Sequence, residues 1–315
     1  TADALAVAAA EQQRACLLVS TDPAHSLGDI FHREIGEAER ALLPNLSAIE
    51  IDPDAEAAHH IATVKDQMKT MVHPRLYDEI DRQLELARHA PGATEAALLE
   101  RVAELMGEAG SRADLVVFDT APSGHTVRLL SLPEVMGAWT DGLLRHRERS
   151  SRLSSALRHL GGGRVKGDDL SLIDAAEDHE AGSLTARLDD VLQTRRRKFL
   201  VARERLLDRL MTAFLLVVNP DRLSILESRK MSDLLARFNV RISAVIVNRV
   251  LPEEAGGDFF RARREQEAIY RREIEEAFAH LPRVVVPLQA HDVHGLDALR
   301  DVGNVLMKGV GAGTR

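Results

Sequence analysis

Two aspartates, each at the end of a short apolar run, are the residues of this chain that most directly predict chemistry. Asp22 closely follows the apolar run 17–19, and Asp119 directly follows the apolar run 115–118. Such runs are typical of buried parallel strands, and open α/β sheets bind ligands beyond the carboxyl ends of their strands. We therefore expect both carboxylates to face one ligand-binding site.

Turn-forming residues and hydroxyl groups surround each acid. The octapeptides are Ser-Thr-Asp-Pro-Ala-His-Ser-Leu at 20–27 and Asp-Thr-Ala-Pro-Ser-Gly-His-Thr at 119–126. Either one alone is common turn chemistry. Two of them at matching strand ends predict paired functional loops, and the helix after each loop would direct its backbone N–H groups at an anion.

The elements that must position these loops alternate along the chain. We expect helices over residues 2–13, 54–70 and 95–108, the last with Thr94 as its N-cap, and strands over 14–20, 46–51, 115–119, 214–219, 240–248 and 284–287. Helices between consecutive strands predict right-handed crossovers. The fold class is therefore α/β, with a mostly parallel sheet flanked by helices.

A long, charged, helical stretch interrupts this alternation. It divides the chain into a first core part over 1–132, an insertion over 133–210 and a second core part over 211–315. Within the insertion, the amphipathic segments 143–160 and 184–207 either line a groove for a client or pack against the core. The sequence does not decide between these two roles.

Composition excludes several classes of function. The chain has 315 residues, a formal charge of −8 and few aromatic residues, which argues against a nucleic-acid partner. Its apolar runs have the length of strands, so we expect no membrane-spanning helix. The single cysteine, Cys16, cannot form an internal disulfide and fits a protein of the reducing cytoplasm.

The two octapeptides resemble switch I and switch II of the ArsA/Get family. This family comprises arsenite-pump ATPases and ATPases that target tail-anchored proteins, within the deviant Walker-A class of P-loop proteins. Three further segments agree with the family pattern, and they are Ala90-Pro91-Gly92, Val218-Asn219-Pro220 and Val247-Asn248-Arg249. The resemblance implies a P-loop NTPase-like fold, with ATP and Mg²⁺ as cofactors.

The resemblance also implies roles for single residues. Asp22 would orient or activate the hydrolytic water, and Asp119 would support Mg²⁺ through water and couple switch II to the γ-phosphate. Asn248 would read the adenine through its side-chain amide, although an asparagine that ends a strand often only caps a turn. The other expected nucleotide contacts are Ser20, Thr120 and Pro287.

The chain departs from the family in its phosphate-binding loop. No G-x-x-x-x-G-K-[ST] motif occurs in the 315 residues, although the family places this loop just before the helix that here begins at Ala2. We expect that the sequence is a fragment of a longer product. The alternative is a remnant that binds or scaffolds without hydrolysing ATP.

Cysteine content bears on the branch of the family. Arsenite is held by three thiolates in the usual site, and the chain offers only Cys16; the Cys-x-x-Cys pair of the zinc-clasped targeting branch is also missing. We therefore expect a bacterial-type, single-core homodimer that couples ATP hydrolysis to anion transport or client delivery. Its partner would be a membrane pump or a hydrophobic membrane-protein client, and the alternative is a nucleotide-switched targeting chaperone for tail-anchored proteins.

Histidines near the predicted site suggest a metal only weakly. His291 and His294 have i, i+3 spacing but lie in a segment that resembles the family's loop on the nucleotide side. Without nearby cysteines or suitably placed acids, we expect no metal site from this pair.

Overall fold

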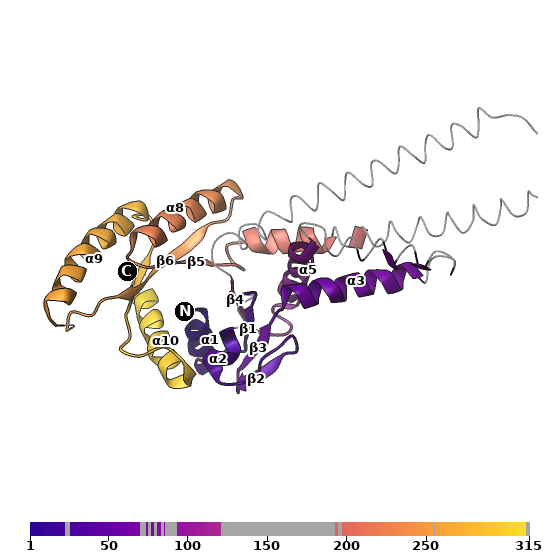
Figure 1. Ribbon diagram of the computed structural model, residues 1–315, viewed down its shortest axis with the longest axis horizontal. Coiled ribbons are helices and arrows are strands. Elements are labelled where there is room, and N and C mark those ends of the chain that lie inside the picture. Colours follow the sequence, from indigo (N-terminus) through magenta and orange to yellow (C-terminus); the bar gives the residue numbers. More distant parts are fainter. Residues whose placement is uncertain are drawn as a thin grey trace, which may run out of the picture.

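The computed structural model describes residues 1–22, 26–69, 74, 77–78, 81–82, 85, 93–120, 193–194, 197–254 and 256–312. In the described part, the strands are β1 (Cys16–Ser20), β2 (Arg40–Leu43), β3 (Leu46–Glu50), β4 (Leu115–Asp119), β5 (Phe214–Val218), β6 (Ile242–Val250) and β7 (Arg283–Pro287). The helices are α1 (Ala2–Glu11), α2 (Ser26–Phe31), α3 (Pro53–Lys69), α5 (Ala93–Glu108), α8 (Arg222–Arg237), α9 (Asp258–Ala277) and α10 (Gly295–Ala312). Figure 1 shows their arrangement.

The first sheet, sheet A, contains the strands of the N-terminal third in the order β2-β3-β1-β4. β1 pairs in parallel with β3 and β4, and β2 pairs antiparallel with β3. Every residue of β1 is buried. A continuous apolar strand that is covered on both faces is what a central parallel strand requires, so the run at 17–19 has the place that its composition predicts.

The second sheet, sheet B, contains only parallel strands in the order β5-β6-β7. One face packs on α8 and α9 through a cluster that includes Val245, Val247 and Ile274. Asp221 caps α8 by accepting a 2.8 Å hydrogen bond from the backbone N–H of Ser224. Figure 1 shows α8 and α9 side by side over this sheet, in orange.

One hydrophobic core joins the two sheets. It contains Val117 of β4 together with Ile246 of β6 and Val284 of β7. α1 and α10 supply the helical side of this core and pack against each other at close range, because Gly303 of α10 has no side chain to separate its backbone from α1. The N- and C-terminal helices therefore bind the two sheets into one structure.

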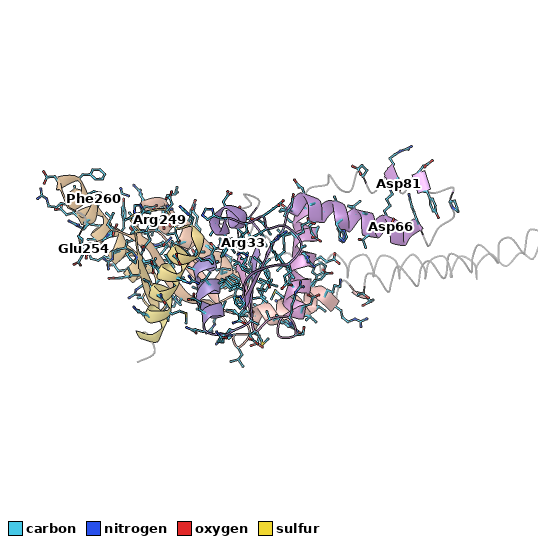
Figure 2. All side chains as sticks on the ribbon, turned by 90° about the horizontal axis from the view of Figure 1, so that it is seen from below. Arg33, Asp66, Asp81, Arg249, Glu254 and Phe260 are labelled. Atoms are coloured by element: carbon cyan, nitrogen blue, oxygen red, sulfur yellow. The ribbon has the colours of Figure 1, made fainter. Side chains whose placement is uncertain are left out.

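The opposite face of sheet A packs on α5 and on the helical residues 197–207. Phe199 lies in the same buried cluster as Leu17 and Leu98, and Lys198 pairs with Glu104 of α5 at 2.7 Å. α3 packs on α5 and extends away from the sheets. Asp66 and Asp81 thus lie at the end of the described structure opposite to Phe260 and Glu254 (Figure 2).

The α/β class with parallel strands flanked by helices is confirmed, and most expected elements lie within two residues of their predicted bounds. The prediction for Thr94 was wrong, because α5 begins at Ala93 and places this residue inside its first turn. The expected single sheet is divided in two, since β4 and β5 do not pair. Two short elements, α2 and β2, were not predicted. Most of the expected insertion over 133–210 lies outside the described residues.

Candidate functional site

The carboxyl ends of three strands are tied together at one edge of sheet A. Ser20 and Asp119 are partners in the register of β1 and β4. The next residue, Thr21, donates from its backbone N–H and from its hydroxyl to the Asp119 carbonyl, at 2.9 and 3.3 Å. On the other side, Ile51 donates its N–H to the Ser20 carbonyl at 3.0 Å. Backbone bonds therefore fix the positions from which the acidic side chains project.

The carboxylates of Asp22 and Asp119 interact at this edge. Burial raises the pKa of Asp119, and the negative charge of Asp22 raises it further. The amino terminus and a hydrogen bond donated by the Thr120 backbone N–H to the Asp119 carboxylate both act in the opposite direction. Both aspartates are half-buried and Thr120 is exposed. Asp22 also donates its N–H to the Ser20 hydroxyl at 3.3 Å. The arrangement concentrates negative charge where a cation would be favoured.

A third acid, Asp3, lies in the first turn of α1. It is 3% exposed, and its Oδ1 makes no hydrogen bond within the described structure. Burial raises the pKa of Asp3 to about 6; the amino terminus opposes this rise and the charge of Asp119 adds to it. The start of α1 is therefore directed at the carboxyl edge of sheet A, as a helix at a phosphate site would be.

The helix after switch I is held by a buried glutamate. Glu50, the last residue of β3, accepts a 2.9 Å hydrogen bond from the backbone N–H of Leu27 in the first turn of α2. A Cβ at Gly28 would lie 3.2 Å from the Arg33 carbonyl, so the turn of chain around α2 closes tightly. A charge-assisted bond to an otherwise free N–H fixes where α2 starts, and with it the return of the chain from Asp22.

The carboxyl end of sheet B presents amide chemistry. Asn248 lies half-buried on β6, just before Arg249, whose φ of 58° is in the left-handed region. The pairing of β6 with β7 shifts register here and resumes between Val250 and Pro287. The backbone bulge redirects the strand end and the side chains along it.

The loop after β6 is fastened to α9. Glu267, which is 7% exposed, accepts the Leu251 backbone N–H on both carboxylate oxygens at 3.1 and 3.2 Å. Arg264 donates to the carbonyls of Pro252 and Glu253 at 3.2 and 2.8 Å. Two charged side chains thus make hydrogen bonds with backbone groups of the loop beyond Asn248 and fasten this loop to α9.

The structure therefore separates the predicted site residues into two groups. Ser20, Asp22, Asp119 and Thr120 gather at the carboxyl edge of sheet A. Asn248 and Pro287 lie on neighbouring strands at the carboxyl edge of sheet B. The rest of both octapeptides, residues 23–25 and 121–126, lies outside the described residues.

Comparison with known proteins places these motifs in a family. The family model described as anion-transporting ATPase (ArsA ATPase) matches residues 1–308. The chain belongs to the ArsA family. It is 29% identical to the ATPase GET3 of Podospora anserina, over 98% of the chain and 86% of that protein. It is 28% identical to the ATPase ASNA1 homolog 1 of Paramecium tetraurelia, over 98% of the chain and 88% of the relative.

One relative, whose name refers to an arsenical pump, is a much longer protein than this chain. The arsenical pump-driving ATPase of Escherichia coli is 32% identical over 89% of the chain, which spans 41% of that ArsA relative. The resemblance to the ArsA/Get family is therefore confirmed, and the parallel α/β architecture agrees with a P-loop NTPase-like ArsA fold.

The donor atoms at sheet A fit the cofactors that an ATPase family implies. Among the described residues, no group of three or more potential ligands is arranged around a metal position. Mg²⁺ does not need such a group, since it keeps several waters and takes one or two carboxylates together with substrate phosphates. The oxygens of Asp119 and Asp22, and the buried Oδ1 of Asp3 that makes no hydrogen bond, are donors of this hard type.

Three buried acids near the predicted site residues were missed by sequence reasoning. Asp3, Glu50 and Glu267 are each buried, but none belongs to a recognised motif. For Glu50 the sequence held a usable signal, because an acid at the end of a buried strand needs a partner. For Asp3 and Glu267, which lie within helices, we find no comparable signal.

Across the described ranges, every helix is too short or too polar to cross a membrane.

Proposed function

We propose that this ArsA-family protein hydrolyses ATP with Mg²⁺, and that Asp22 and Asp119 carry the reaction. The observation that supports the proposal most directly is the interaction of these two acids at the tied ends of β1 and β4, beside the start of α1. The ATPase names of the relatives support the same reaction.

The division of work between the acids follows from their surroundings. Asp22 lies just beyond β1, and its backbone N–H donates to the Ser20 hydroxyl, so its carboxylate would orient the attacking water from the end of this strand. Asp119, the last residue of β4, is desolvated by burial and would hold the hydrated Mg²⁺. When bound, the ion supplies neutralisation of charge on the β- and γ-phosphates. Ser20 and Thr120 would contact the nucleotide or its water shell.

The base is assigned to the edge of sheet B. Asn248 carries both a donor and an acceptor on one amide, which matches the edge of adenine. The left-handed Arg249 and the carboxylate of Glu267, which accepts from the Leu251 N–H, hold the chain just beyond this position. Pro287, on the neighbouring strand, would contact the same nucleotide.

A phosphate-binding loop is still needed for hydrolysis, and we propose that it is carried by a strand between β4 and β5. Within the described structure, β4 pairs only with β1, and β5 pairs only with β6. Leu215 and Val217 of β5 are 39% and 42% exposed, although both are apolar strand residues. A strand and its loop at this edge would bury them and satisfy two rows of backbone groups.

The test uses the chain joined to such a loop and strand, with release of phosphate from MgATP as the readout. Asp22→Asn should lower turnover by about 10²- to 10⁴-fold, the range expected on loss of a group that positions or activates water. Binding of ATP should stay near the parental affinity. Asp29→Asn, an exposed acid on α2, is the control and should leave turnover unchanged. Parental turnover in the Asp22 variant would remove this residue from the mechanism.

Two uses of the ATPase cycle stay in competition, transport of an arsenite-type anion and delivery of a hydrophobic client. The only cysteine, Cys16, is buried, and burial raises its pKa to about 11, so a thiolate site for arsenite is not supported by this chain. The long match to a GET3 protein favours a nucleotide-switched targeting factor as the second candidate. Stimulation of turnover by arsenite would favour the pump, and ATP-dependent capture of a hydrophobic helix would favour targeting.

We further propose a cytoplasmic homodimer. A single core suggests self-pairing, because a pair of cores would be supplied by two copies of the chain. Sedimentation with and without ATP tests the pairing. If the loop-bearing protein bound no nucleotide, the non-hydrolysing alternative would replace the ATPase proposal.

A further inference from the structure

Two histidines that lie far apart in the sequence meet on the surface. His32 follows α2 directly, and His294 precedes α10. Nε2 of His32 lies 3.1 Å from Nδ1 of His294, and the two rings are nearly perpendicular, with centroids 5.1 Å apart. Both side chains are exposed. We propose that His32 and His294 form a binding site for a divalent transition-metal ion, with Zn²⁺ as its simplest occupant.

The separation of the two nitrogens is the first argument. Two imidazole nitrogens that each lie about 2.0–2.1 Å from one metal ion, at angles between octahedral and tetrahedral, are about 2.9–3.4 Å apart. The observed 3.1 Å falls within this interval. The two nitrogens now share a hydrogen bond, and an ion would replace its proton once both rings turn their lone pairs toward a common point, with water in the remaining positions.

The backbone holds the two segments that carry these histidines against each other before any ion binds. His32 has a φ of 51°, an uncommon conformation for a residue with a side chain, and Gly295 has a φ of 75°. A Cβ on Gly295 would lie 3.9 Å from the His32 ring, so the two chain segments touch at this point. Beneath them, Phe31 of α2 and Leu299 of α10 are buried in one core. Pre-positioned ligands reduce the entropy cost of closing a site.

The chemistry selects the class of ion. Imidazole nitrogen suits Zn²⁺, Cu²⁺ and Ni²⁺, whereas Mg²⁺ prefers oxygen. No third ligand is arranged with these two among the described residues. The site is therefore open and distinct from the carboxylate site at sheet A, and it does not depend on the proposed hydrolysis. Its effect would be to fasten α2, which follows switch I, to the loop before α10.

Titration calorimetry of the tag-free chain with ZnCl₂ tests the proposal. The variants are His32→Asn, which keeps a residue that tolerates positive φ, and His294→Gln. Each should weaken binding of one equivalent of Zn²⁺ at least tenfold, and the double variant should lose no more than either single variant. His280→Gln removes another exposed histidine and should bind like the parent. Excess Mg²⁺ should not compete.

A second measurement guards against weakly bound zinc at other histidines. X-ray absorption on the loaded protein should show two imidazole nitrogens at about 2.0–2.1 Å. Hydrogen exchange of the amides in residues 26–35 should slow on addition of Zn²⁺ in the parent and not in the double variant. Equal zinc binding by the parent and both single variants, or exchange that zinc slows equally in the double variant, would overturn the site.

Discussion

Sheet A and sheet B differ in the burial of their strands and in the chemistry of their carboxyl ends. Every residue of β1 is buried, whereas β5 alternates between partly buried and exposed residues. The loops after sheet A carry the acids Asp22 and Asp119, and sheet B ends with the amide of Asn248. The sheet with the fully buried strand β1 therefore carries the groups assigned to phosphate chemistry, while the sheet with the partly exposed strand β5 carries the group assigned to base recognition.

The difference in burial predicts the largest effect on stability. Leu18→Ala in β1 removes a side chain with 0% exposure and should lower the free energy of unfolding by about 2–5 kcal/mol. Leu215→Ala in β5 removes a side chain that is 39% exposed and should cost less than about 1 kcal/mol. Urea denaturation measures both. Equal losses of unfolding free energy in the two variants would mean that Leu215 is buried in solution. The proposed strand beside β5 would bury this side chain in a protein that contains it.

Asp3, the buried acid of α1 beside sheet A, predicts that the free energy of unfolding depends on pH. Burial raises the pKa of Asp3 to about 6 in the folded protein, whereas the unfolded chain releases this proton near the ordinary aspartate pKa of 3.8. The free energy of unfolding should therefore fall as pH rises through this window, by about 3 kcal/mol at 1.36 kcal/mol per unit.

Asp3→Asn cannot ionise, so its free energy of unfolding should lack this fall. Denaturation of both proteins at pH 4 and pH 7.5 gives the comparison, with the variant gaining on the parent at the higher pH. Parallel pH profiles would show that Asp3 is ionised in the folded state, or that its carboxyl is reached by water.

The contact that joins the two halves predicts a smaller loss. A Cβ on Gly303 would lie 2.7 Å from the Ala4 carbonyl of α1, so Gly303→Ala should separate α10 from α1 and cost about 1–3 kcal/mol. Gly107 of α5 has open space at the same position, and Gly107→Ala should stabilise by about 0.4–1 kcal/mol. Thermal unfolding distinguishes the pair. A neutral Gly303 variant would show that the helices shift without loss of packing.

The smallest predicted change concerns the attachment of α2 to sheet A. Glu50→Gln weakens the acceptor for the Leu27 N–H and should cost about 1 kcal/mol, since a hydrogen bond to a charged group becomes a neutral one. Faster hydrogen exchange should be confined to α2. The exposed Glu254 provides the control, and Glu254→Gln should change neither quantity. If the amides of α2 exchanged at the parental rate in the Glu50 variant, other contacts would be holding α2.

The sequence was sufficient to predict the acids at the strand ends, but it was insufficient to predict contacts between segments that lie far apart along the chain. Asp22 and Asp119 were predicted to share a site because apolar runs define buried strands, and parallel strands end at a common edge. Glu50 and Asp3 escaped notice because their importance comes from burial against segments distant in the sequence. His294 was compared with His291, its neighbour in sequence, whereas its actual partner is His32. Register and tertiary contact decide such pairings, and local spacing does not encode them.

The two hydrogen bonds from Thr21 to the Asp119 carbonyl separate architecture from reactivity. Because neither bond uses the Asp119 carboxylate, this acidic side chain can be exchanged without loosening the strands that carry it. A replacement such as asparagine should yield a fully assembled but idle protein.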